Sequence, residues 1–309
     1  MAEGVLQIGE LGRRTGLSPD VIRAWERRYE LLRPTRTPGN FRLYSADDIS
    51  RLRLMQHYLG RGIPASQAAG LVHKVQTAAL DSHPGLPPED VRRTLKLLGR
   101  SLEHFDAGPA DRTLERLLRV FPPGAVLRDV VLPYLRELGE KWACGETTIA
   151  QEHFASAFLE GWMLSMARGW GERGGRGAVL ACVPGDRHTL GLIAFGLALR
   201  DLDWKVTYLG ADTPLNAVDQ AAEAVSADAV ILASALPGTL TPANDQLRDL
   251  ARRHPVAVGG AGVAPHRSTW LASRSLPTDP VIAAQALTLA LSREVGAPAD
   301  ESRATAGRV

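Results

Sequence analysis

Between residues 177 and 291, short apolar runs alternate with longer amphipathic stretches. The apolar runs lack polar alternation, which is typical of parallel strands covered on both faces. The predicted strands cover residues 178–183, 205–209, 229–233 and 255–259, and the predicted helices cover residues 189–200, 216–225, 243–254 and 281–291. This order predicts a Rossmann-like, doubly wound and right-handed parallel sheet over residues 173–295. A ligand of such a sheet is expected beyond the carboxyl ends of its strands.

The middle of the chain has the period of amphipathic helices instead. Leu95, Leu98 and Leu102 recur on one face of the first of them, and similar stripes follow in the others. The helices are predicted at residues 88–105, 109–120, 123–141 and 147–168. A four-helix bundle over residues 89–172 buries all four stripes together. Prolines and a glycine before it predict a linker at residues 77–88.

The first part of the chain predicts a helix-turn-helix with a wing. A short amphipathic helix over residues 6–16 is followed by Ser18, a good N-cap, and by Pro19 at the first position of the next helix. That second helix covers residues 19–29, and a basic, turn-rich segment at residues 33–44 suits a hairpin wing. Two further helices, at residues 47–59 and 64–72, complete a domain over residues 1–76.

Composition and charge set limits on the kind of protein. The chain has 309 residues, 45% hydrophobic and 23% charged, and no apolar run approaches the length of a membrane span. The N-terminus does not resemble a signal peptide, and two cysteines, Cys144 and Cys182, fit a reducing compartment, so we expect a cytoplasmic protein without a membrane partner. Residues 1–75 carry twelve Lys and Arg against seven Asp and Glu, which favours a polyanionic partner for this part alone. The small, polar residues 296–309 predict a disordered tail.

The basic N-terminal domain carries a specific resemblance. Its motif consists of Trp25-Glu26-Arg27-Arg28-Tyr29, then Pro34, Arg36, Thr37, Gly39, Arg42 and Tyr44. These residues resemble the DNA-binding domain of MerR-type regulators, in the subgroup of cobalamin-dependent regulators. The alternative is a solvated basic domain without a nucleic-acid role. The residues expected to touch DNA, mostly at phosphates, are Arg23, Arg27, Arg36, Arg42 and Tyr44.

A second motif begins where the first strand of the predicted sheet ends. Asp186, His188 and Gly191 follow this strand, Ser234 and Leu236 follow the third strand, and the pair at 259–260 follows the fourth. No G-x-G-x-x-G follows the first strand, which argues against a dinucleotide site. Taken one by one, a loop histidine is usually a solvated side chain and a glycine pair is a weak signal. Together the residues resemble the cobalamin-binding module of methionine synthase and its relatives.

The resemblance implies roles for these residues. His188 would bind cobalt as the lower axial ligand in place of the cofactor's own benzimidazole (the base-off form), and Asp186 would fix the tautomer of its ring. Gly191 would let the corrin approach closely, and Ser234 with Leu236 would line the cavity for the nucleotide tail. The remaining residues expected to contact the cofactor from this domain are Gly185, Arg187, Leu209, Gly259 and Gly260.

In the predicted bundle, Trp142 precedes Glu152 and His153 by about three helical turns of sequence. Read separately, Trp142 is a core aromatic, and Glu152 and His153 are a solvated pair. The spacing is similar to the helical cap of CarH-type photoreceptors, which covers the upper face of adenosylcobalamin. The resemblance implies that Trp142 packs on the adenosyl group and that Glu152 and His153 contact that group or the partner subunit. Ile149 would lie in the wall of the same space.

One residue departs from the pattern of that family. CarH-type photoreceptors have a histidine directly after this tryptophan, which captures cobalt after illumination, whereas this chain has Ala143. Cys144 follows it and is a candidate substitute ligand. Either the illuminated state has water as its ligand, or light is not the signal.

Together the motifs resemble a CarH/LitR-type cobalamin-dependent regulator of the MerR family, which is not an enzyme. The implied function is that of a repressor that binds adenosylcobalamin, forms a homo-oligomer, expected to be a tetramer, on promoter DNA in the dark, and releases DNA in light. One alternative is a corrinoid protein that carries a methyl group. Another is a MerR-type regulator that light does not control.

Overall fold

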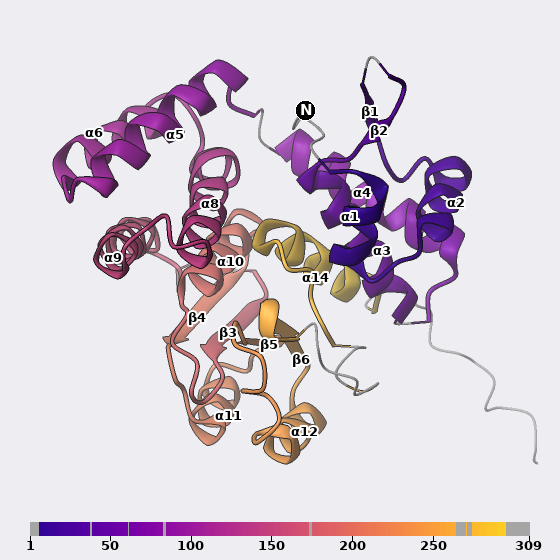
Figure 1. Cartoon of the computed structure of the whole chain (residues 1–309). Coiled ribbons are helices and arrows are strands. Elements are labelled where there is room, and N and C mark those ends of the chain that lie inside the picture. The colour runs from indigo at the N-terminus through magenta and orange to yellow at the C-terminus, as the bar shows by residue number, and fades with distance from the viewer. Residues whose placement is uncertain are drawn as a thin grey trace, which may run out of the picture.

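The computed structural model describes residues 6–37, 39–60, 62–82, 85–172, 175–263, 270 and 274–294. The predicted tail at residues 296–309 lies outside this range. The chain forms a helical N-terminal head (residues 6–82), a helical bundle (residues 85–172) and an α/β domain (residues 175–294), as Figure 1 shows. None of the described helices is both long enough and apolar enough to cross a lipid bilayer.

The head has the predicted helix-turn-helix and wing. Its elements are α1 (Ile8–Thr15), α2 (Pro19–Tyr29), β1 (Thr35–Arg36), β2 (Arg42–Leu43), α3 (Ala46–Gly60) and α4 (Ala65–Ser82). The hydroxyl of Ser18 accepts a hydrogen bond from the backbone N–H of Val21 at 3.3 Å, as its predicted N-cap role requires. The last helix is longer than predicted and continues into the predicted linker, because residues 73–82 contain neither proline nor glycine to end it.

The bundle contains the four predicted helical segments. They are α5 (Pro88–Glu103), α6 (Ala107–Leu118), the continuous run of α7 (Pro123–Val126), η1 (Leu127–Val131) and α8 (Leu132–Ala143), and α9 (Ile149–Met166). The third segment widens into a π-helical turn at η1, which was not predicted. Pro133 follows this turn and has no backbone N–H to donate, so the regular bonding pattern cannot continue through it. A capping box between Thr148 and Gln151 starts α9.

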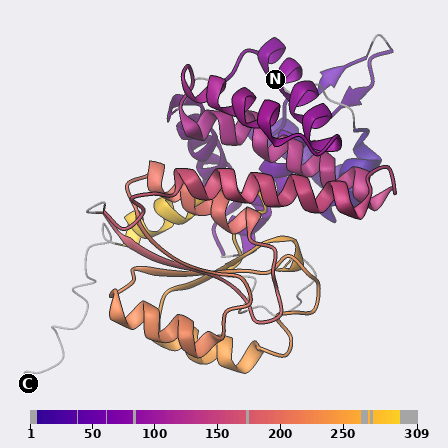
Figure 2. The same cartoon turned by 90° about the vertical axis from the view of Figure 1, so that its left-hand side faces the viewer.

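The α/β domain has a parallel sheet in the strand order β4-β3-β5-β6. Its strands are β3 (Gly177–Cys182), β4 (Lys205–Gly210), β5 (Ala229–Ala233) and β6 (Val256–Gly259). Its helices are α10 (Leu190–Asp201), α11 (Leu215–Ala224), α12 (Asn244–Arg253), the short η2 (Ala261–Val263) and α14 (Pro280–Glu294). Figure 2 shows helices above and below this sheet. The first strand of the domain, β3, lies between β4 on one side and β5 on the other. The chain therefore winds in both directions from β3, which confirms the predicted doubly wound sheet.

The two faces of the sheet belong to different apolar cores. Alternate residues of β3, such as Val179, pack with α11 and α12, while Leu180 packs with α10, α14 and the bundle. The bundle and one face of the sheet therefore share a continuous core. The chain winds to opposite sides of β3, and a doubly wound sheet forms its ligand-binding crevice at such a point. The loops after β3 and β5 lie there, facing α9.

Candidate functional site

The buried carboxylate of Asp186 organises the loop after β3. One of its oxygens, Oδ1, accepts hydrogen bonds from the backbone N–H of His188 at 3.0 Å and from its ring Nδ1 at 2.8 Å. The other, Oδ2, accepts from the backbone N–H groups of Ala235 at 2.5 Å and Leu236 at 3.3 Å. Asp186 is only 1% exposed. It therefore joins the loop after β3 to the loop after β5.

These bonds determine the chemistry of the histidine. Burial raises the pKa of Asp186, but the backbone and ring hydrogen bonds from His188 and those from Ala235 and Leu236 outweigh it, so the pKa is lowered overall. An ionised carboxylate only accepts hydrogen bonds, so Nδ1 of His188 carries the hydrogen that it donates. In the neutral form of this ring Nε2 has a free lone pair, and the side chain is 57% exposed. Such a nitrogen is a ready metal ligand.

This imidazole faces a cavity of about 780 Å³ between the bundle and the α/β domain. On the bundle side α9 contributes Glu152, His153 and Glu160. The lining from the α/β domain comes from the loops after β3, β5 and β6 and from the start of α14, namely Arg187–Leu192, Phe195, Ile231–Ala235, Gly259–Ala261, Leu276–Thr278, Pro280 and Ala283. The cavity is within the size range of cofactor sites and lies at the expected end of the sheet.

Two glycines allow the loops of the α/β domain to approach one another. The φ angle of Gly260 is +106°, and a Cβ atom there would lie 2.3 Å from the carbonyl oxygen of Ser234. A Cβ atom on Gly262 would lie 2.4 Å from the carbonyl oxygen of Leu236. No other residue fits at these positions without moving the backbone. Gly259 has only ordinary contacts with Leu276, so its role does not depend on such crowding.

The predicted residues of the α/β domain have different places around the cavity. Ser234 is fully buried, and its hydroxyl shares a hydrogen bond of 2.8 Å with Thr239. Gly191 starts α10 with open space beside its Cα, while Gly185 donates to Asp212 at 2.7 Å. Four predicted residues are not part of the cavity lining: Gly185, Asp186, Leu236 and Leu209. Leu209 packs with the core on the opposite face of the sheet, because β4 points this residue toward α11.

On the opposite wall, Glu152 and His153 form a pair on α9. Glu152 accepts hydrogen bonds from the ring Nδ1 of His153 and from the hydroxyl of Ser156, both at 2.7 Å. Burial raises the pKa of Glu152, but these bonds and the charges of His153 and His188 lower it overall. Glu152 and His188 both line the cavity, one from α9 and the other from the loop after β3.

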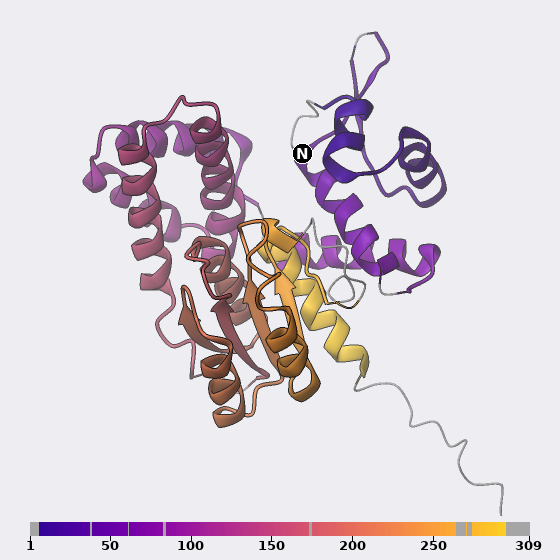
Figure 3. The same cartoon turned by 60° about the horizontal axis from the view of Figure 1, so that its bottom comes forward.

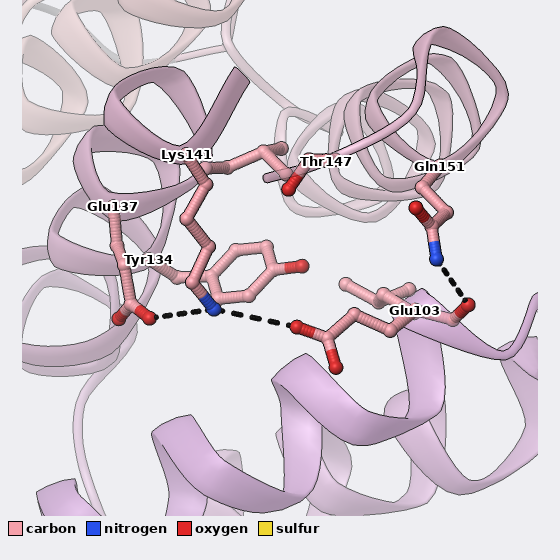
Figure 4. A pocket seen from close by; sticks show the side chains of 8 residues that line it. Glu103, Tyr134, Glu137, Lys141, Thr147 and Gln151 are labelled. Carbon is pink, nitrogen blue, oxygen red and sulfur yellow. Dashed lines mark hydrogen bonds and ion pairs between the residues drawn. The ribbon is translucent and has the colours of Figure 1, made fainter. Parts of the chain in front are cut away.

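The other two predicted residues of the bundle lie beside this wall. Trp142 is 54% exposed and Ile149 is 66% exposed, and neither lines the cavity. Figure 4 shows the polar contacts that join the end of α8 and the start of α9 to α5. Lys141 pairs with Glu137 at 3.0 Å and with Glu103 at 3.3 Å, which joins α8 to α5. The end of α8, where Trp142 lies, is thus held in place while its indole remains open to solvent.

The sequence patterns missed two contacts between the parts of the site. The hydroxyl of Thr189 donates to Glu160 of α9 at 2.5 Å, and Arg136 of α8 pairs with Asp279 before α14, also at 2.5 Å. The first had a visible signal, since Glu160 is an isolated carboxylate in the largely apolar sequence of α9. The second joins residues that are 143 positions apart and had none.

In the head, α2 and the wing carry several exposed arginines. Arg23, Arg27 and Arg36 are exposed, and Arg42 is exposed while its Nε donates to Glu26 at 2.8 Å. Tyr44 is the exception to the predicted set of DNA contacts, because it is fully buried and its hydroxyl donates to the other oxygen of Glu26 at 2.9 Å. It supports the joint between α2 and the wing from inside, so the expectation that it touches DNA is corrected.

Comparison with known proteins connects these features. Residues 6–74 match the family of MerR HTH family regulatory proteins, and residues 95–164 and 176–288 match two B12 binding domain families. The chain is 30% identical over 277 residues to the HTH-type transcriptional repressor CarH of Myxococcus xanthus, covering 87% of this chain and 93% of that protein. The chain belongs to the CarH family of MerR-type transcriptional regulators. The CarH-type chain is also 32% identical over 267 residues to the repressor CarA of the same organism, covering 84% and 88% of the two chains.

A solved structure shares the fold of the CarH-type bundle and α/β domain. The monomethylamine corrinoid protein of Methanosarcina barkeri matches 62% of this chain and 96% of its own with a TM-score of 0.50 at 17% identity. The residues of the cavity also fit a corrinoid. The nitrogens of the corrin ring already hold its cobalt, so the free Nε2 of His188 suffices as a protein ligand. No cluster of three metal-binding side chains is present among the described residues, nor is one needed.

Proposed function

We propose that this regulator is a repressor that binds adenosylcobalamin with His188 as the lower ligand of cobalt, and that the state of the cofactor controls its assembly on promoter DNA. The observation that carries the proposal is the Asp186–His188 pair facing a cavity in the same chain as a basic winged head. The cofactor, when bound, supplies a cobalt–carbon bond that light can break.

Different residues of the chain would hold the two faces of this cofactor. Asp186 fixes the tautomer that leaves Nε2 of His188 free for cobalt. From the α9 side Glu152 and His153 would contact the upper group, and Trp142, which lies beside this wall, would pack on it. A bulky adenosyl group gives the exposed indole of Trp142 a packing partner, and its loss takes this partner away.

We further propose that this change controls oligomerisation. Trp142 and Ile149 are more than half exposed, which is unusual for large apolar residues so close together in sequence. The cofactor and a second subunit together would cover them. A homo-oligomer, which we propose is a tetramer, presents several heads to one promoter, and the linked heads bind far more tightly than a single head.

Ala143 favours a second candidate, a cobalamin-dependent regulator that light does not control. The family histidine that captures cobalt after illumination is absent here, while the exposed Cys144 follows Ala143 as the C-cap residue of α8. If light is the signal, either water or this thiol takes the upper position afterwards. The two candidates differ in one observable, the response of the loaded protein to light.

The test is gel filtration with absorption spectroscopy on the full-length chain, in darkness and after green light. We expect adenosylcobalamin to shift the protein to a larger species in darkness, and illumination to reverse this shift. His188→Ala is expected to lose the spectrum of histidine-bound cobalt. An unchanged elution volume after photolysis would reject control by light, and cobalamin uptake by His188→Ala with an unaltered spectrum would reject the ligand assignment.

A further inference from the structure

The helix α14 is apolar on more than one side. Ala283, Ala284 and Leu287 pack into the core shared with α10 and the bundle. Ile282, Ala286 and Leu289 instead belong to the core of the head. A surface helix of a globular protein needs only one apolar stripe, so a helix with two stripes requires two partners. The second partner of α14 is the DNA-binding head.

The contact with the head is made by α4. Leu71, Val72 and Val75 of this helix are at most 4% exposed, and Ala286 of α14 is 2% exposed within the same cluster. Figure 3 shows α14, in yellow, between the sheet and the head. The head is therefore packed on the α/β domain as well as joined to the bundle through the chain between α4 and α5.

This docking leaves the DNA-binding surface open. α2 and the wing lie on the side of the head away from α14, as Figures 1 and 3 show. Arg23 and Arg27 of α2 are exposed. The contact therefore sets the direction in which the head points without covering the residues expected to meet DNA.

The first turn of α14 reaches the cavity. Pro280 and Ala283 line it, together with Leu276 and Thr278 before the helix. The carboxylate of Asp279 caps the helix by accepting from the N–H groups of Val281 at 3.0 Å and Ile282 at 3.1 Å, and it also pairs with Arg136. Arg136 belongs to α8, the helix that also carries Trp142. The helix α14 and the residue before it therefore contact the bundle, the cavity and the head.

We propose that α14 docks the DNA-binding head onto the α/β domain and couples head docking to cofactor binding. The coupling rests on the proposed function, whereas the docking does not. An α-helix moves as a stiff body, so a ligand that displaces Pro280 and Ala283 also shifts Ala286, one turn further on, against α4. Coupling of this kind is reciprocal, and undocking the head must change the affinity for the cofactor.

The test compares Ala286→Arg with Ala290→Arg in the full-length protein. Position 290 is one turn further along α14, is partly exposed and belongs to neither core, so it controls for the added charge and bulk. Hydrogen exchange of α4 and proteolysis between α4 and α5 report docking without cofactor. Absorbance titration with adenosylcobalamin then gives the Kd of each variant.

We expect Ala286→Arg to raise exchange in α4 and cleavage after it, and to change the Kd by about fivefold or more. Ala290→Arg is expected to match the wild type in both. Unchanged exchange in Ala286→Arg would overturn the docking, and undocking with an unchanged Kd would overturn the coupling. Leu289→Gln, which removes apolar contact without adding bulk, must give the same direction, and retained DNA binding shows that the head is still folded.

Failure of the proposed function has a different signature. If the wild-type chain takes up no adenosylcobalamin, the cofactor assignment and the coupling are both rejected. Hydrogen exchange of α4 would still test whether the head docks on α14. If the wild type binds the cofactor and Ala286→Arg binds it equally, only the coupling falls.

Discussion

The direction of one imidazole depends on one buried carboxylate. Asp186 accepts hydrogen bonds from two backbone loops and from the ring of His188, so it fixes the ring and the loops together. An amide at this position offers only one oxygen as an acceptor, and its N–H groups would oppose donors. Partners of a metal-binding histidine therefore matter nearly as much as the histidine itself.

We predict that Asp186→Asn raises the Kd for cobalamin about 10- to 100-fold, because the tautomer and the position of His188 are no longer fixed. Absorbance titration measures the affinity and the ligation state together. Asp249→Asn is the matched control, since this carboxylate is exposed on α12 and pairs with Arg252 of the same helix. Equal affinity of Asp186→Asn and the wild type would mean that the ring needs no such support.

The two cysteines differ in environment and should differ in reactivity. Cys182 is fully buried at the end of β3, and burial first, then the charges of Asp186 and Glu160, raise its pKa to about 12. Cys144 is exposed. Because a thiolate is the reactive form, only the exposed cysteine should react in the folded protein.

We predict that a thiol reagent at pH 8 titrates one cysteine in the native chain and both after denaturation. Cys144→Ser should show none before denaturation. The raised pKa also has a consequence for stability: above the ordinary value of 9.0, the unfolded chain loses the proton of Cys182 and the folded chain keeps it. Stability should therefore fall as the pH rises above about 9, and less so in Cys182→Ala.

At the scale of elements, the loops after β5 and β6 depend on glycine. Gly260 has a φ of +106° and would place a Cβ 2.3 Å from the carbonyl oxygen of Ser234. Gly139 of α8, by contrast, has open space where a Cβ would be added. The same substitution should thus have opposite signs at the two sites.

We predict that Gly260→Ala destabilises the α/β domain by about 3 kcal/mol or more, from backbone strain and the collision together. Gly139→Ala should stabilise the bundle by about 1 kcal/mol through helix propensity. Thermal unfolding followed by circular dichroism measures both changes. An unchanged melting temperature of Gly260→Ala would mean that the loops after β5 and β6 can move apart at little cost in stability. The close approach of Gly260 to Ser234 would then not require glycine.

The comparison of sequence and structure is also clearest at this scale. The strands and most helices could be predicted because their apolar runs and Pro or Gly boundaries are local signals, as at Ser18 and Pro19 before α2. The hydrogen bond between Asp186 and His188 could be predicted from their place in a motif that resembles cobalamin-binding modules. The partners of Thr189 and Asp279 could not, because side-chain pairs across domains leave no periodic trace. Tyr44 was misjudged for a related reason, since nothing local shows which way the end of a two-residue strand faces.

At the scale of the whole molecule, the arrangement separates the basic surface from the cofactor. The exposed arginines of α2 and the wing lie on the head, while the cavity lies between the bundle and the sheet. The helix α14 contacts the head and also lines the cavity. Under the proposed function, a single head binds DNA weakly, and loading the cofactor would change DNA binding by changing how many heads act together, rather than by altering the arginines themselves.

We predict that this difference appears in the salt dependence of DNA binding. The slope of log K against log salt grows with the number of phosphates contacted, so the protein loaded in darkness should have a steeper slope than the cofactor-free protein on the same promoter fragment. Arg27→Ala should reduce the slope by about one for each engaged head and weaken binding to all sequences alike. Arg119→Ala, at an exposed arginine that caps the C-terminus of α6, should leave the slope unchanged. Equal slopes with and without cofactor would show that the number of engaged heads stays the same, and the gain in affinity would then have to come from a reorientation of each head on α14.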